Sequence, residues 1–134
     1  MEKILEFKLD QKTMSMNQAY SVNNYGRRFL IKEGKEYKKM ISLMVKVQAN
    51  KNKLKYKNFK RFSCVYLFGF KNGLKKDGEI KKGMYDYDSG IKLLQDAIFE
   101  TLGYDDALIV SSFQEKSFKK DFIEVVVYGS EEKP

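Results

Sequence analysis

The sequence predicts a single α+β domain, residues 1–134, in which two helices pack on a small mixed β-sheet and the elements follow the order β-α-β-α-β-β. A chain of 134 residues has the length of one domain and can bury a core without a disulfide. Stretches with the apolar spacing of helices alternate along it with stretches that have the spacing of strands, as in domains that pack helices on a sheet. The hydrophobic fraction of 43% is that of a folded protein.

The first half of the chain predicts a strand, a loop and a helix. Apolar and charged residues alternate in residues 3–9, which indicates a strand with one buried face. Residues 13–29 are rich in Asn and Ser and have no sustained period, so we expect a loop. Residues 33–48 predict a helix, because apolar residues recur there at helical spacing. These apolar residues are Tyr37, Met40, Ile41, Met44 and Val47.

A central strand and a basic loop follow. Residues 61–70 are apolar on both faces and rich in aromatics, which is typical of a strand inside a sheet. Residues 71–83 contain five lysines and three glycines, a composition that cannot bury a face, so we expect a mobile basic loop.

The last part of the chain predicts a second helix and two strands. Apolar residues fall at helical spacing from Asp88 to Leu102, and Gly103 follows as a stop signal. Residues 107–113 and 121–128 are rich in β-branched and aromatic residues, which predicts two strands separated by a polar turn.

The absence of histidine and the single cysteine, Cys64, exclude several kinds of chemistry. No nucleophile activated by histidine is possible, and neither is a zinc site with histidine ligands. A lone cysteine in an apolar segment is expected to be a buried, inert thiol. Any bound metal must therefore be held by oxygen ligands, which favours Mg²⁺ or Mn²⁺.

Charge and hydropathy point to a cytoplasmic protein with an anionic partner. The chain carries a formal net charge of +8, and lysines are interleaved with aromatic residues in residues 50–62. This combination is typical of surfaces that bind phosphates. No apolar stretch has the length of a membrane span, and the beginning of the sequence lacks a signal-peptide core.

The acidic residues gather in residues 83–115, which contain seven carboxylates and one basic residue, Lys92. Asp86 and Asp88 stand two positions apart, so in an extended segment their side chains point to the same side. That arrangement is tolerated best when a cation lies between the carboxylates. The same aspartates also suit turns and helix caps, so spacing alone leaves both interpretations open.

The rest of the cluster lies on and after the second predicted helix. Lys92 follows Asp88 by four positions and would lie on the same side of the helix, one turn further on. Asp105 and Asp106 come after Gly103, so the chain must turn back along the helix to bring either of them near Asp86. Two further acids of the helix are expected to be solvated and not to be ligands, namely Asp96 and Glu100.

Residues 86–106 resemble the central motif of RusA-type Holliday junction resolvases. Asp86, Asp88 and Lys92 stand at the spacing of that motif, and Asp105-Asp106 closes it. Ser89 stands where the family has asparagine, and the gap before Asp105 is shorter, so either final aspartate can match the third family carboxylate, with the count from Asp86 favouring Asp106. An opening segment also resembles the family through Asn17, Tyr20, Lys32 and Tyr37.

The resemblance implies a homodimeric, Mg²⁺-dependent endonuclease that cuts four-way DNA junctions by paired, symmetric incisions. It implies that Asp86, Asp88 and Asp106 hold the metal, with Asp105 as the alternative to Asp106, and that Lys92 acts on the scissile phosphate. One alternative is a protein that binds branched DNA without cutting it. Another is a basic RNA-binding protein in which the aspartates are caps only. The candidate DNA contacts are Arg27, Arg28, Lys32, Lys75, Lys76, Lys81 and Lys82.

Overall fold

The computed structural model describes residues 1–82 and 87–134, with residues 16, 17 and 87–89 described by their backbone alone. Its main sheet has four strands in the order β1-β6-β4-β5. They are β1 (Glu2–Leu9), β4 (Arg61–Gly69), β5 (Ile109–Ser117) and β6 (Phe122–Ser130). Strand β6 runs antiparallel to both β1 and β4, while β4 and β5 are parallel, so the sheet is mixed, as the sequence predicts.

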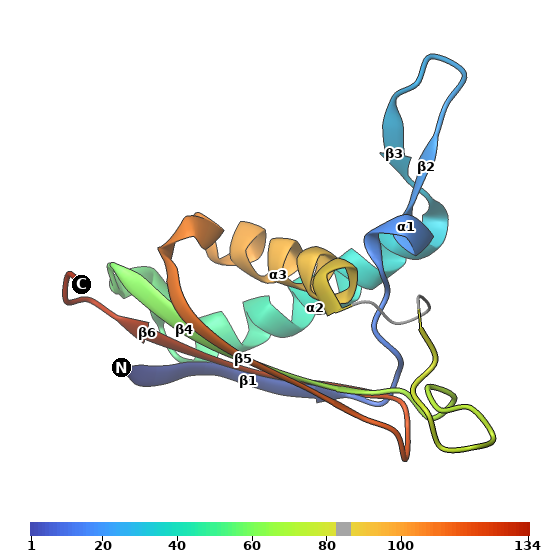
Figure 1. Cartoon of the computed structure of the whole chain (residues 1–134). Coiled ribbons are helices and arrows are strands. Elements are labelled where there is room, and N and C mark those ends of the chain that lie inside the picture. The colour runs from blue at the N-terminus through green and yellow to red at the C-terminus, as the bar shows by residue number, and fades with distance from the viewer. Residues whose placement is uncertain (83–86) are drawn as a thin grey trace.

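Two long helices lie on one face of this sheet (Figure 1). They are α2 (Lys32–Lys51) and α3 (Tyr87–Leu102). Helix α3 connects the parallel strands β4 and β5, which need a long crossover because a tight turn cannot join them. The predicted α+β class and the main element order are confirmed. Shorter elements are the helix α1 (Met16–Ala19) and the 3₁₀ turns η1 (Leu54–Tyr56) and η2 (Asp106–Leu108).

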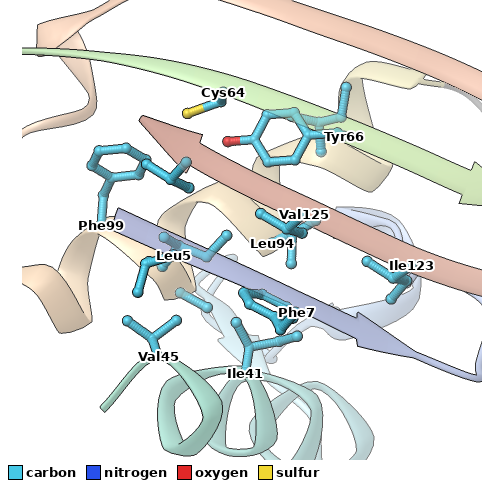
Figure 2. Packing of buried hydrophobic residues seen from close by; sticks show 14 of the residues in the cluster. Leu5, Phe7, Ile41, Val45, Cys64, Tyr66, Leu94, Phe99, Ile123 and Val125 are labelled. Carbon is cyan, nitrogen blue, oxygen red and sulfur yellow. The ribbon is translucent and has the colours of Figure 1, made fainter. Parts of the chain in front are cut away.

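The core lies between the sheet and the two helices (Figure 2). Buried and half-buried residues alternate along β4 and β6, because successive side chains of a strand point to opposite faces. Ile41 and Val45 of α2 pack beside Leu5 and Phe7 of β1, and all four are at most 5% exposed. Burial of this apolar surface is the main force that holds the helices to the sheet.

The expectation of a plain loop in residues 13–29 is wrong, because this segment contains α1 and a two-stranded hairpin. The strands are β2 (Tyr20–Val22) and β3 (Arg28–Leu30). Three-residue strands are too short to show an alternating pattern, so the sequence gives no periodic signal for them. Their position depends on tertiary packing, since Ala19 at the base of the hairpin is fully buried.

The apolar stripe of α2 also differs from the prediction at one position. Tyr37, Ile41 and Val45 recur every four residues and are buried, whereas Val47 is 67% exposed. Val47 lies two residues beyond Val45, which places it on the opposite side of the helix. The residue that fills the core at this point is therefore Val45.

The basic loop between β4 and α3 is held by backbone hydrogen bonds over its described part, up to Lys82. Leu74 and Ile80 form an isolated β-bridge. Lys75 N donates to the Glu79 carbonyl at 2.7 Å, and Lys81 N donates to the Gly73 carbonyl at 2.9 Å. The segment is thus a compact turn, and its expected mobility stays a prediction. Across the described residues, no helix has the length and apolar character needed to cross a membrane.

Candidate functional site

A cluster of polar side chains lies where α3 meets η2. Lys92, Gln95 and Asp96 share one side of α3, because residues three and four positions apart are neighbours on a helix surface. Lys92 Nζ lies 3.2 Å from Asp96 Oδ1 and 3.6 Å from Asp106 Oδ2. Gln95 Nε2 also donates to Asp106 Oδ2, at 3.3 Å. The cluster therefore joins two carboxylates, an amide and one ammonium group.

Asp106 reaches the middle of α3 because the chain reverses direction after the helix. Gly103 adopts φ +80°, a left-handed conformation that ends helices and favours glycine. The ring of Tyr104 then packs against Phe59 and Phe62, with centroids 5.9 and 5.1 Å away. This aromatic contact anchors the turn, so that η2 runs back beside α3 and presents Asp106 to Lys92.

Asp105 has a different environment from its neighbour. Its side chain accepts a hydrogen bond from Ala107 N at 2.8 Å and caps η2. This is the turn chemistry that short polar side chains perform at the start of helices. Of the two adjacent aspartates, Asp106 faces Lys92 and Asp105 serves the local turn.

A buried tyrosine connects the cluster to the sheet. The hydroxyl of Tyr66 donates to Gln95 Oε1 at 3.0 Å, and Tyr66 is fully buried in β4. Burial, with smaller contributions from Cys64 and Asp106, raises the pKa of this hydroxyl, so it remains a proton donor. Gln95 is thereby fixed between Tyr66 and Asp106. Neither Gln95 nor Tyr66 is predicted as a site residue from the sequence, although Gln95 stands three positions after Lys92 and so lies on the same side of the helix.

Lys92 is held protonated by its carboxylate neighbours. Its hydrogen bond with Asp96 and the charges of Asp96 and Asp106 raise the pKa of the ammonium group. The side chain of Asp96 is only 23% exposed, so the expectation that it is a solvated helix residue is wrong. Glu100 is 65% exposed and pairs with Lys38 at 3.1 Å, as a surface residue does.

The two remaining carboxylates of the motif are less fully described. Asp86 lies outside the described residues. Asp88 belongs to the first turn of α3, four positions before Lys92, and its side chain is not described. The backbone of this turn is held by Thr13, whose hydroxyl donates to the Gly90 carbonyl at 3.1 Å.

The contact at Thr13 is buried and supported by Tyr37. The two hydroxyl oxygens lie 3.2 Å apart, and burial raises the pKa of Tyr37 to about 12. A side chain on Gly90 would meet Thr13 Cγ2 at 3.1 Å. The segment before α1 is therefore packed closely against the start of α3, which fixes the backbone that carries Asp88.

The donor set of the cluster suits a hard cation. The chain has no histidine, and Cys64 is fully buried with its thiol pKa raised by burial to about 11. Carboxylate oxygens, which Mg²⁺ and Mn²⁺ prefer, are the ligands that remain. Among the side chains that the structure describes, no group of three carboxylates or thiols is close enough to hold a metal ion. A complete metal site would therefore need Asp86 or Asp88 in addition to Asp106.

The candidate DNA contacts lie in two segments and at the start of α2. In Figure 1 the β2–β3 hairpin and the loop before α3 are at the same end of the molecule, where α3 begins. Lys32 pairs with Glu36 at 4.0 Å and Lys75 pairs with Glu79 at 3.9 Å, both at the surface. The hairpin carries Arg27 and Arg28, and the loop carries Lys75, Lys76, Lys81 and Lys82.

Comparisons with known proteins add no relative. A scan against protein-family models matches no family, and a search of curated proteins finds no match. The functional proposal therefore depends on the residues of this chain and on their arrangement.

Proposed function

We propose that the protein is a Mg²⁺-dependent, structure-selective DNA endonuclease that resolves four-way junctions by paired, symmetric cuts in the cytoplasm. The observation that carries this proposal is the return of η2 along α3, which brings Asp106 within 3.6 Å of Lys92. Lys92 in turn lies one helical turn after Asp88. A lysine is thus placed among carboxylates from separate parts of the motif.

The proposed ligands are Asp86, Asp88 and Asp106, because Asp105 is engaged in capping η2. The chemistry that Mg²⁺ or Mn²⁺ supplies in a carboxylate site is activation of water for attack on a phosphodiester and neutralisation of the leaving oxygen. Gln95 holds Asp106 in place by its hydrogen bond. Lys92, kept protonated by its neighbours, is able to donate to an oxygen of the scissile phosphate.

The remaining surface supports capture of DNA by its phosphates. The net charge of +8 favours binding that depends little on sequence and strongly on salt. Because one chain supplies one carboxylate cluster, paired cuts need two chains related by a two-fold axis. Light scattering of the free protein is therefore expected to give a mass near twice 15.7 kDa. A monomer that makes paired cuts would contradict the homodimer.

The test is cleavage of a synthetic four-way junction with and without Mg²⁺. Asp88→Asn and Asp106→Asn should each lower the single-turnover rate by about a hundredfold or more, roughly 2.7 kcal/mol of barrier, while junction binding is kept or strengthened because negative charge near DNA is removed. Asp105→Asn is the matched control, since asparagine also caps helices, and it should cut at nearly the wild-type rate. If Asp106→Asn cuts normally and Asp105→Asn does not, the ligand assignment is wrong.

A second candidate is a protein that binds branched DNA without cutting it. The observation in its favour is that Lys92 already pairs with both Asp96 and Asp106, so these carboxylates have a cationic partner within the chain. This candidate predicts a shifted junction with no product at any Mg²⁺ or Mn²⁺ concentration. Cutting by the wild type excludes it.

A further inference from the structure

The hairpin β2–β3 extends away from the sheet and the long helices (Figure 1). Its strands pair from Tyr20↔Leu30 to Val22↔Arg28. Three of its apolar side chains are largely exposed, because Tyr25 at the tip is 90% exposed, Val22 60% and Phe29 45%. Single exposed apolar residues are common on protein surfaces. Here Val22 and Phe29 point to opposite faces of the ribbon, because Val22 pairs with Arg28 and Phe29 with Ser21, so the exposed ring of Tyr25 at the tip is the feature of the hairpin that a partner can reach.

The tip of the hairpin is an ordered turn. Asn23 Oδ1 accepts from Tyr25 N at 2.9 Å and from Arg27 N at 3.0 Å. Asn23 N donates to the Arg27 carbonyl at 2.9 Å, and Gly26 N donates to the Asn23 carbonyl at 3.0 Å. Gly26 adopts φ +75°, which costs glycine little and other residues more. These bonds hold the turn in the conformation that presents Tyr25 to solvent.

The base of the hairpin is fixed on α2. Ile31 N donates to the Ala19 carbonyl at 2.9 Å, closing the ribbon behind Leu30. A Cβ atom on Gly34 would lie 2.6 Å from the Ala19 carbonyl oxygen and 3.0 Å from Leu30 Cδ2, so the base packs directly on the helix backbone. The hairpin is therefore an exposed element with an anchored base and a tied tip.

The hairpin is connected to the proposed site through α1 and the segment before it. The hairpin follows α1 directly, and the segment before α1 packs on the first turn of α3 through Thr13 and Gly90. The strand residue Arg28 lies over the ring of Tyr20, with its guanidinium carbon 4.9 Å from the centroid. An aromatic tip next to arginines is the combination that binds unstacked bases and their phosphates.

We propose that the β2–β3 hairpin is a base-stacking finger, in which Tyr25 stacks on a base that is unstacked at the branch point of DNA while Arg27 and Arg28 contact the flanking phosphates. This inference rests on the proposed function, because it takes branched DNA as the substrate. It assigns recognition of the branch point to the hairpin and general phosphate binding to the remaining basic surface. Fully stacked duplex DNA offers no base to Tyr25, so the finger contributes selectivity for branched DNA.

The experiment measures binding to a four-way junction that carries 2-aminopurine at the branch point, and to the matching duplex, at one fixed salt concentration. Tyr25→Ala should lose junction affinity by about five- to a hundredfold, the range expected for one base–aromatic stack, and should keep its duplex affinity within about twofold. The wild type should change the fluorescence of 2-aminopurine, and this change should disappear in Tyr25→Ala. Tyr25→Phe should restore both signals, because its ring also stacks.

The matched control is Phe113→Ala, since Phe113 is 55% exposed and lies in β5, outside the hairpin and outside the basic stretch that contains Tyr56. It should bind the junction like the wild type. Unchanged junction affinity and fluorescence in Tyr25→Ala would overturn the finger, and so would an equal loss for Phe113→Ala. A Tyr25→Ala variant with a smaller solution mass than the wild type would also overturn it, because the hairpin would then bind a second copy of the chain.

These outcomes are separable from failure of the proposed function. A wild type that cuts junctions while Tyr25→Ala binds them normally overturns the finger alone. A wild type that gives the Tyr25-dependent fluorescence change and never cuts overturns the endonuclease alone and supports the finger.

Discussion

The ammonium group of Lys92 forms ion pairs with two carboxylates. Its Nζ lies within 3.6 Å of both Asp96 and Asp106, although its side chain is 53% exposed. Ion pairs with this much exposure contribute little to stability. Substitution of Lys92 is therefore expected to change the rate of the reaction and not the free energy of folding.

Substitution of Lys92 by alanine should slow single-turnover cleavage of a junction by about a hundredfold or more, as expected for loss of a group that stabilises charge in the transition state. Junction affinity should change little, because one lysine releases about one counterion from DNA. The matched control is Lys38→Ala, which removes a lysine of α2 that pairs with Glu100 of α3. An equal loss of rate and affinity in Lys92→Ala would make Lys92 a binding residue.

The buried thiol of Cys64 and the buried phenol of Tyr37 should make the free energy of unfolding decrease at alkaline pH. Burial raises the pKa of Cys64 from 9.0 to about 11 and that of Tyr37 from 10.0 to about 12. Both groups hold their proton more tightly in the folded state, so the stability they contribute is complete below pH 9.0 and is lost as pH rises through these folded values. Urea unfolding should show a decrease on the order of 2 kcal/mol between about pH 8 and about pH 10.5. Cys64→Ala should flatten the first part of this decrease, and an unchanged slope would contradict the assignment.

The base of the hairpin, where Gly34 packs on Ala19 and Leu30, is the part of the hairpin that tolerates an added side chain least. Gly34→Ala places a methyl group 2.6 Å from the Ala19 carbonyl oxygen, a distance that forces the backbone to move. We expect a loss of about 2 kcal/mol or more in the free energy of unfolding, as for other overpacked sites. Thermal and urea unfolding would measure it. Lys35→Ala, at the next and exposed position of α2, should stay within about 0.5 kcal/mol. Equal stability of the two variants would contradict the close packing.

The elements also show what could be predicted from the sequence. Helix α3 and strand β4 were predicted nearly to their ends, because their apolar residues repeat over many positions and the repeat reflects local geometry. The hairpin was missed, since its short strands depend on the contact between Ala19 and Gly34. For the turn after α3, the sequence predicts only that the chain must run back along the helix, and it does not indicate which contacts hold the turn. The turn depends on the packing of Tyr104 on Phe59 and Phe62, which joins residues distant in sequence.

The loop before α3 places positive charge at one end of the molecule (Figure 1). Replacing Lys75, Lys76, Lys81 and Lys82 by alanine should weaken binding to every form of DNA. It should also lower the slope of log affinity against log salt by up to about three or four units, at about 0.9 per phosphate contact. The matched control removes four other exposed lysines, Lys3, Lys39, Lys46 and Lys133.

The control variant keeps the same net charge as the loop variant, and its lysines lie on β1, on α2 and after β6. If both variants lose the same slope, DNA responds to the total charge of the protein. If the loop variant keeps the wild-type slope, the loop does not contact DNA.

The strand order has a consequence for how the protein is made. Strand β1 pairs along its length with β6, from Glu2↔Gly129 to Leu9↔Ile123, and β6 also lies beside β4. On the ribosome, β1 emerges first and its partner last among the described strands, so the sheet cannot close until Phe122–Ser130 has been synthesised. Until then β1 exposes an apolar face and unpaired backbone groups, which attract chaperones and aggregation. A ribosome that stalls before Phe122 would therefore release an incomplete sheet, and we expect cellular proteases to remove it.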